Sequence, residues 1–168
     1  MISEPKLEYR DAQPYVGIRT LASMPELPEV IPGHTRKVFA WLKEHGLSAS
    51  GPPFVRYHVI NMEAKLDIEL GVPVANAVTA NGLVKADVLP AGRYASLVYT
   101  GPYAGDGLMR ANAALLEWGA KQGLEWDRFD DPNGDGFGSR YESYITDPGE
   151  ESDPMKWVTE VAIRVADK

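Results

Sequence analysis

The chain carries one helical pattern twice, and an internal repeat restricts the fold more than any single motif does. Trp41–Leu47 has the sequence Trp-Leu-Lys-Glu-His-Gly-Leu, and Trp118–Leu124 has Trp-Gly-Ala-Lys-Gln-Gly-Leu. Each copy places a tryptophan in a predicted helix that ends at a Gly-Leu pair, because glycine commonly terminates helices. The repeat predicts two related structural units in succession.

Apolar spacing predicts one helix in each copy, over Gly33–His45 and Asp106–Gln122. A proline-rich connector with Pro25, Pro28 and Pro32 precedes the first helix. Alternating apolar residues bounded by turn residues predict the strands. These strands cover Lys6–Arg10, Tyr15–Thr20, Phe54–Asn61, Ala64–Val74, Leu83–Leu89, Tyr94–Thr100, Arg140–Thr146 and Lys156–Val165.

The strands that follow the two helices also match each other. Aligning Arg56–Ile60 with Tyr141–Ile145 places Tyr57 opposite Glu142. The second copy is longer, because a loop rich in glycine, aspartate and proline occupies 127–138. Loops accept such insertions at little cost in stability.

These patterns predict the α+β class, with two pseudo-symmetric β-α-β-β repeats that form a curved antiparallel sheet. Two main helices and a cleft between the halves complete the expected fold. One repeat alone would leave a sheet face without a packing partner, so the two should share a core. We expect a single domain over residues 1–168, with repeat one at 1–78 and repeat two at 79–168.

Composition disfavours several classes of protein. The chain has no cysteine, which removes disulfides, thiol catalysis and cysteine-ligated zinc. Its formal net charge is −7, with 24 acidic and 17 basic residues, whereas nucleic-acid binding needs a positive surface. We find neither a signal-peptide pattern nor a run of about 18 apolar residues. We expect a cytoplasmic protein that contacts no nucleic acid or membrane and holds no cofactor.

Four segments resemble the GyrI-like family, whose domains also serve as the effector-binding domains of AraC-type and MerR-type multidrug regulators. The most recognisable is an aromatic-Glu-x-Tyr strand that ends in Asp-Pro, here Tyr141–Pro148. The other segments are Asp67–Val74, Ala91–Ala95 with Tyr99–Tyr103, and Leu115–Trp118. Their order and spacing extend the resemblance over nearly the whole chain.

The resemblance implies a curved sheet backed by helices, with a ligand cleft between the halves. The family glutamate falls on Glu142, which by this resemblance would face bound cationic, apolar drugs. Some stand-alone members of the family are hydrolases that open the cyclopropane ring of DNA-alkylating antibiotics. The regulators carry a helix-turn-helix domain, and the short segment before Lys6 is too small to hold one, so a transcription factor is not expected.

Glu142 lies two residues from Tyr144 in a predicted strand, and both side chains therefore share one face. A carboxylate among aromatic rings is partly desolvated, so it needs a partner or a proton and can attract a ligand cation. The alternatives are a solvent-facing glutamate or one paired with Arg140. The ligand-binding candidates are Glu142, Tyr144, Tyr57, Tyr99, Tyr103, Trp118 and Glu69.

Glu69 and Glu160 occupy matching positions in the two repeats. If the pseudo-axis brings them together, one pKa rises and the two carboxylates become an acid–base pair. Exposed strand carboxylates are the alternative. The sequence assigns no catalytic residue, and Glu142 and Glu69 are the candidates if the protein is an enzyme.

The segment Asp131–Glu142 satisfies the ligand spacing of an EF-hand calcium loop. The context argues against calcium, because an EF-hand needs a helix on each side. Residues after Glu142 are instead predicted to form a strand that ends at Pro148. The composition of Asp131–Glu142 also suits a long surface hairpin loop. We expect no metal site.

Three functions follow from these observations. The first is binding of small lipophilic molecules, either neutral or cationic, in an aromatic cleft with a central glutamate. The second is hydrolysis of cyclopropane-bearing alkylating compounds in the same cleft. The third is a protein-interaction module that inhibits an enzyme. The sequence does not distinguish binding from turnover, and it does not define the oligomeric state.

Overall fold

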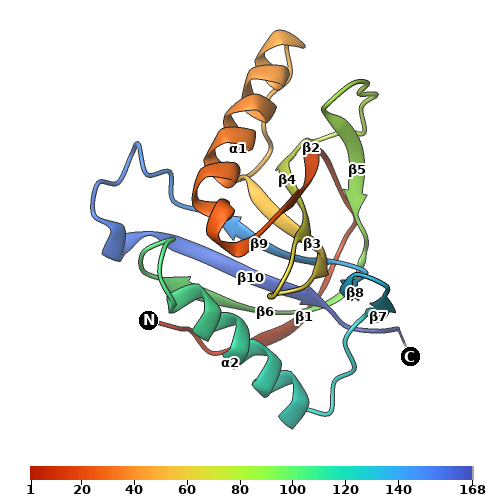
Figure 1. Ribbon diagram of the computed structural model, residues 1–168, viewed down its shortest axis with the longest axis vertical. Helices are drawn as coiled ribbons and strands as arrows, with labels where there is room; N and C mark the ends of the chain where they lie inside the picture. Colours follow the sequence, from red (N-terminus) through yellow and green to blue (C-terminus); the bar gives the residue numbers. More distant parts are fainter. Residues whose placement is uncertain (168) are drawn as a thin grey trace.

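The computed structural model describes residues 1–167, which form the α+β fold predicted from the sequence (Figure 1). The first repeat contains β2 (Gln13–Ala22), α1 (Leu27–Glu44), β3 (Phe54–Ile60) and β4 (Leu66–Pro73). The second contains β6 (Gly92–Thr100), α2 (Gly107–Lys121), β9 (Arg140–Tyr144) and β10 (Val158–Arg164). The other strands are β1 (Lys6–Arg10), β5 (Lys85–Leu89), β7 (Arg128–Asp131) and β8 (Gly134–Phe137).

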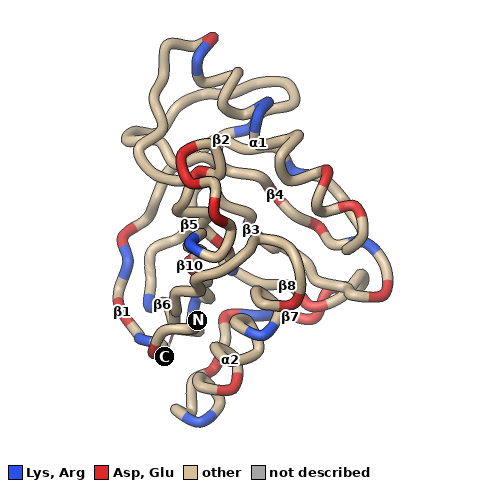
Figure 2. Tube along the Cα trace, turned by 90° about the vertical axis from the view of Figure 1, so that its left-hand side faces the viewer, with Lys and Arg blue, Asp and Glu red and all other residues tan. Residues whose placement is uncertain are grey.

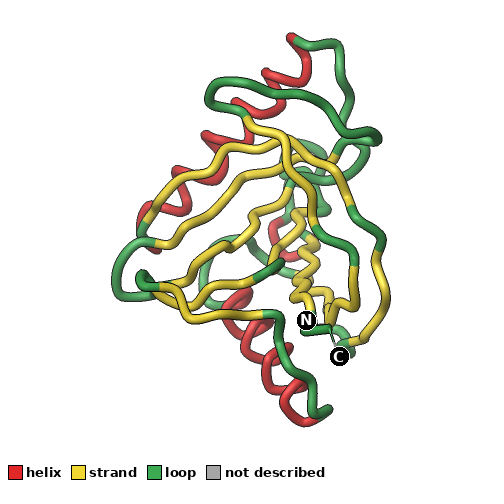
Figure 3. Tube along the Cα trace, turned by 90° about the vertical axis from the view of Figure 1, so that its right-hand side faces the viewer, coloured by secondary structure: helices red, strands yellow, loops and turns green. Residues whose placement is uncertain are grey.

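One curved antiparallel sheet runs through the fold, in the strand order β1-β6-β10-β9-β3-β4-β2-β5 (Figures 1 and 3). From the central β9–β3 pair outwards, β10 and β6 on one side correspond to β4 and β2 on the other. The edge strands are exchanged, since β1 precedes β2 in the chain but pairs with β6, and β5 precedes β6 but pairs with β2. Each half therefore covers an edge of the other, which would otherwise expose unpaired backbone groups.

The central strand pairing locates the pseudo-two-fold axis. Val55 of β3 lies opposite Glu142 of β9. On their other sides, Val55 pairs with Leu70 of β4 and Glu142 pairs with Val161 of β10. The strand bounds select this pair, because β1 and β2 begin 79 residues before β5 and β6, which makes Ile18 of β2 equivalent to Leu97 of β6. These two residues end the row of paired residues through Val55 and Glu142, so the axis passes through that pair. Val55 is thus the repeat equivalent of Glu142.

This register shifts the internal alignment of the repeats by two residues. The sequence alignment matched Tyr57 with Glu142, which is wrong, because the ladder makes Tyr57 equivalent to Tyr144. A shift of two keeps every side chain on its original face, so alternation of apolar residues could not reveal the error. The equivalence of Glu69 and Glu160 agrees with the ladder.

Three apolar cores lie on the helix-bearing face of the sheet, and one of them packs the start of α1, at Leu27, against β3 and β4. Beneath α1, Val38 and Leu42 pack with residues of β2 and β4. Beneath α2, Ala111 and Leu115 pack with residues of β6 and β10. In each helix the pair is four residues apart and so lies on one stripe. Burial of each such leucine contributes about 1.5–3 kcal/mol.

The other face of the sheet, which carries neither helix, has its own aromatic cluster. Its buried members are Tyr15, Phe54, Leu89, Tyr94, Tyr141 and Ala162. Tyr15 and Phe54 meet edge to face, with 5.0 Å between ring centroids. We call this the helix-free face.

Two boundary predictions are corrected by the structure. The expected proline-rich connector is partly helical, since α1 begins at Leu27 and includes Pro28 and Pro32. Proline suits the first helical turn, where its missing N–H has no partner to lose, and only Pro32 lies further inside the helix. The expected loop 127–138 forms the hairpin β7–β8, and β8 pairs with β3.

Acidic and basic residues are interspersed along both helices (Figure 2). Within residues 1–167, we find no helix of the length and apolarity that a membrane span requires.

Gly71 provides a test of the packing between the central strands. A Cβ at Gly71 would lie 2.4 Å from Phe54 Cζ and 3.0 Å from Tyr15 Cδ2, and both rings are 1% exposed. Because these rings have no room to move, Gly71→Ala should lower the free energy of unfolding by about 1–3 kcal/mol. Urea denaturation measures this change.

The matched control is Gly33 in α1, where a Cβ would meet no atom within 4 Å. Alanine is the better helix former, so Gly33→Ala should raise the free energy of unfolding by about 0.5–1 kcal/mol. Equal effects of the two substitutions would contradict the packing described here.

Candidate functional site

Glu142 lies at the centre of a row of paired residues that crosses the helix-bearing face. The row is Ile18, Leu70, Val55, Glu142, Val161 and Leu97. Directly paired residues point to the same face of a sheet. One end of the row belongs to the core beneath α1 and the other to the core beneath α2. Glu142 is therefore a carboxylate midway between two apolar cores.

Glu142 is 5% exposed, and its carboxylate accepts hydrogen bonds from side chains of three elements. The Tyr57 hydroxyl of β3 and the Tyr144 hydroxyl of β9 donate to Oε1 at 3.1 and 3.2 Å. Asn112 of α2 donates from Nδ2 to Oε2 at 2.9 Å. Burying an ionised carboxylate is unfavourable unless such donors replace its water. Glu142 is therefore a buried group held in place, and not a solvent-facing strand residue.

Tyr57 and Tyr144 are related by the pseudo-axis and donate to the same oxygen atom. Burial, followed by the charge of Glu142, raises the pKa of each hydroxyl well above its usual range. Both hydroxyls stay protonated at neutral pH and remain donors. Hydrogen bonds to a charged group contribute about 1.5–3 kcal/mol each, so the pair is a main support of the buried carboxylate.

Asn112 was not among the sequence candidates, and Arg140 was considered only as a direct partner of Glu142. The structure connects the three residues instead. Arg140 Nη2 donates to Asn112 Oδ1 at 3.1 Å, so Asn112 bridges Arg140 and Glu142. Asn112 lies four residues from both Leu108 and Leu116. A polar residue inside that apolar helical stripe was the signal that could have identified it.

Three further aromatic candidates divide into a site neighbour and two core residues. Tyr103 packs on Tyr144, with 5.0 Å between ring centroids. Tyr99 is buried in the core beneath α2, and the half-buried Trp118 packs against that same core. The structure thus brings Tyr103 beside the Glu142 cluster, which consists of Glu142, Tyr57, Tyr144 and Asn112. Tyr99 and Trp118 instead help to pack α2 on the sheet.

Glu69 lies on the helix-free face, away from the Glu142 cluster. Its carboxylate is 3% exposed and is hydrogen-bonded to the Tyr15 hydroxyl at 2.6 Å and to His58 Nε2 at 2.8 Å. Glu160 instead binds Arg10. Strands β9 and β3 separate the strands of Glu69 and Glu160, and neighbouring strands lie about 4.8 Å apart. The structure does not bring these two carboxylates together as an acid–base pair.

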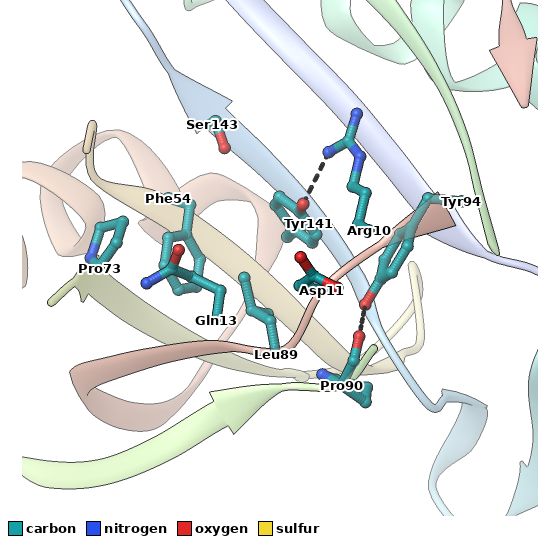
Figure 4. Close-up of a pocket in the computed structure, with 10 residues that line it drawn as sticks. All are labelled: Arg10, Asp11, Gln13, Phe54, Pro73, Leu89, Pro90, Tyr94, Tyr141 and Ser143. Atoms are coloured by element: carbon teal, nitrogen blue, oxygen red, sulfur yellow. Dashed lines mark hydrogen bonds between the residues drawn. The ribbon is translucent and has the colours of Figure 1, made fainter. Parts of the chain in front are cut away.

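Two cavities open on the helix-free face. One, of about 210 Å³, is lined by residues that include Gln13, Phe54, Leu89 and Tyr141 (Figure 4). The other, of about 530 Å³, lies beside the β7–β8 hairpin and includes His58. Glu142 lines neither of them. Because Glu142 is buried beneath Tyr57, Tyr144 and Asn112, a molecule that reaches it must separate side chains that are in contact in this structure.

The EF-hand spacing of Asp131–Glu142 is distributed over three strands. Asp131 pairs with Gly134 inside the β7–β8 hairpin, and Glu142 belongs to β9 in the main sheet. The carboxylate of Glu142 points to tyrosine and asparagine donors. The segment therefore lacks the helix–loop–helix geometry of an EF-hand.

A family model described as the GyrI-like small molecule binding domain matches residues 3–166. The chain belongs to the GyrI-like family. No curated protein matches its sequence. Among solved structures, the EcmrR C-terminal domain has a TM-score of 0.77 and 22% identity, and the alignment covers 98% of each chain. The chain spans 58% of the length of EcmrR as seen in its DNA complex.

Two other solved structures share the fold at lower identity. SAV2435 bound to tetraphenylphosphonium has a TM-score of 0.62 and 12% identity, over 98% of this chain and 94% of that one. A hydrolase from Listeria innocua has a TM-score of 0.63 and 13% identity, over 97% and 92%. At such identities, the similarity shows the GyrI-like fold and no shared ligand or activity.

The pH dependence of stability tests the Glu69 network of this GyrI-like domain. Burial alone would raise the pKa of Glu69, but hydrogen bonds with His58 and Tyr15 outweigh it and the pKa is lowered. Ionised Glu69 therefore stabilises the fold above the ordinary glutamate pKa. This contribution is lost as the pH falls through the lower, folded-state pKa.

We expect Glu69→Gln to reduce the free energy of unfolding by about 1–3 kcal/mol at pH 7. The difference from wild type should shrink below about pH 4, close to the ordinary pKa of glutamate. Urea denaturation at pH 7 and pH 3.5 measures both values, with the exposed Glu63→Gln as control. A difference that stays constant with pH would show that the pKa of Glu69 is the same in the folded and unfolded states, which contradicts the network described above.

Proposed function

We propose that this GyrI-like domain binds lipophilic small molecules on its helix-bearing face, in contact with Glu142. The observation that carries the proposal is the buried carboxylate at the pseudo-axis, which accepts hydrogen bonds from Tyr57 and Tyr144, with Tyr103 packed on the Tyr144 ring. Aromatic rings supply large apolar contact area with polar edges, which suits ligands of varied shape. Membership of a small-molecule-binding family supports the same assignment.

The charge of Glu142 favours a ligand with a cationic group. Its three hydrogen-bond donors are neutral side chains. Among residues 1–167, no lysine or arginine nitrogen forms an ion pair with it. A ligand cation would supply the missing charge, and the faces of Tyr57 and Tyr144 would add cation–π attraction. That SAV2435 has been solved with tetraphenylphosphonium agrees with a lipophilic cation as a first probe.

Binding requires a rearrangement, because Glu142 is only 5% exposed. The side chains that cover it come from β3, β9 and α2. A tyrosine that rotates away loses one hydrogen bond to the carboxylate, and the ligand must replace that bond. Ligands with both an apolar body and a polar group meet this requirement better than purely apolar molecules.

Titration with tetraphenylphosphonium, followed by tryptophan fluorescence, tests the proposal. We expect saturable binding by the wild-type protein and a loss of roughly tenfold or more in affinity for Glu142→Gln, equivalent to ~1.4 kcal/mol. The same substitution should reduce the affinity for the neutral compound triphenylphosphine oxide far less, because this compound carries no net charge. The matched control is Glu160→Gln, since Glu160 binds Arg10 on the helix-free face.

No saturable binding of any lipophilic probe would contradict the proposal. Equal affinity of wild type and Glu142→Gln for the cation would remove Glu142 from the site.

Hydrolysis of cyclopropane-bearing alkylating compounds is a second candidate, which one observation favours. Tyr57 and Tyr144 hydroxyls flank the carboxylate, and burial, followed by the charge of Glu142, raises the pKa of both. In such an arrangement a carboxylate activates water while a hydroxyl polarises the electrophile. Water would add across one strained C–C bond, with the hydroxyl on one carbon and the proton on the other.

Mass spectrometry of a spirocyclopropane alkylating antibiotic after incubation separates the two functions. A gain of one water mass that Glu142→Gln abolishes would establish the hydrolase. Binding of the compound with unchanged mass would establish a binding protein without turnover.

A further inference from the structure

Arg140 is a half-buried cation that uses few of its hydrogen-bond donors. A guanidinium has five N–H groups. In this protein Nη2 donates to Asn112, and the guanidinium lies over the Phe137 ring at 4.8 Å from its centroid. Nε is buried and has no hydrogen-bond partner. Within residues 1–167, Arg140 forms no ion pair with a carboxylate.

The other largely buried arginines are better satisfied. Arg10 makes two hydrogen bonds to Glu160, and Arg164 forms an ion pair with Asp127. Arg56 also has a buried Nε without a partner, but it donates three hydrogen bonds, to Tyr15 and to two backbone carbonyls. Buried charges in proteins are normally paired. The shortage of acceptors therefore distinguishes Arg140 from the arginines that have a structural role.

Burial lowers the pKa of Arg140, although Glu142 opposes this shift. An arginine side chain nevertheless keeps its proton at neutral pH. The protein therefore maintains a partly desolvated positive charge close to the Glu142 cluster. A ligand acceptor could reach it without breaking an ion pair.

Arg140 and Glu142 are placed to contact two ends of one molecule. They are two residues apart on β9 and so point to the same face. Two residues of extended strand span about 7 Å. Asn112 lies between them, with its amide oxygen facing Arg140 and its amide nitrogen facing Glu142. Near the pseudo-axis, a negative group, a bridging amide and a positive group thus lie next to one another on the helix-bearing face.

We propose that the Glu142 site selects zwitterionic lipophilic ligands, with a cationic group at Glu142 and a carboxylate or similar anionic group at Arg140. This inference rests on the proposed function, which requires only that a lipophilic molecule binds beside Glu142. It adds Arg140 as the residue that determines specificity. A planar carboxylate suits the guanidinium because two parallel N–H groups can donate to its two oxygens.

Rhodamine B and its ethyl ester form a matched pair of probes. Both carry the same xanthylium cation and aromatic body, and only rhodamine B carries a free carboxylate. We expect the wild-type protein to bind rhodamine B on the order of tenfold more tightly than the ester, as a charge-assisted hydrogen bond to a carboxylate implies. Fluorescence anisotropy of each dye gives both dissociation constants.

Two variants test whether Arg140 causes the preference for rhodamine B over its ester. Arg140→Gln should abolish the preference, so that rhodamine B and the ester bind this variant with equal affinity. Glu142→Gln should weaken both dyes by a similar factor, because both carry the cation. The comparison of the two dyes in the wild-type protein needs no variant, so it decides the question even if Arg140→Gln fails to fold.

The outcomes distinguish this inference from the proposed function. If both dyes bind with equal affinity, or if the ester binds more tightly, selection by Arg140 is refuted while lipophilic binding stands. A preference for rhodamine B that persists in folded Arg140→Gln also refutes the role of Arg140. If no lipophilic probe saturates the protein, the proposed function fails and the inference fails with it.

Discussion

The pairing of β3 with β9 joins the two halves of the sheet, and the rest of the fold depends on it. Its central pair is Val55 and Glu142, so a carboxylate occupies the position where the halves meet. An unpaired ionised group there would oppose association of the halves by several kcal/mol. Tyr57, Tyr144 and Asn112 offset that penalty through hydrogen bonds from both halves. The groups that hold Glu142 therefore also hold the two repeats together.

The exchange of edge strands adds a second constraint on the halves. Strand β1 lies on β6 and strand β5 lies on β2, so neither half completes its sheet without chain from the other. Non-local pairing of this kind carries a cost in chain entropy. In return, two exposed edges are covered. A ligand that separates side chains at the axis can therefore act on a scaffold whose halves remain connected at both outer edges.

The sequence predicted the architecture well because its signals were repeated and periodic. Two helices with a Trp and a Gly-Leu end, and strands with alternating apolar residues, were sufficient for the fold class. Predictions about single residues were wrong where different arrangements in space produce the same sequence pattern. A two-residue slip preserves alternation, so Tyr57 was matched with Glu142 in place of Tyr144. Tyr99 and Trp118 are large aromatics, yet composition alone does not separate a core ring from a site ring. Asn112 and Arg140 became site residues only when the packing of α2 on the sheet was known.

The two repeats are pseudo-symmetric in their backbone, but the charges of the site between them are not symmetric. The register that relates Val55 to Glu142 also relates Pro53 to Arg140, so both charges come from the second repeat. The first repeat contributes Val55, Pro53 and the neutral donor Tyr57. A symmetric ligand would meet charge on one side only, and half of its polar groups would lose water without gaining a partner. An asymmetric molecule, with an apolar body toward β3 and polar groups along β9, satisfies both sides. Divergence of two repeats at an otherwise symmetric interface is thus sufficient to give such a site a preferred orientation for its ligand.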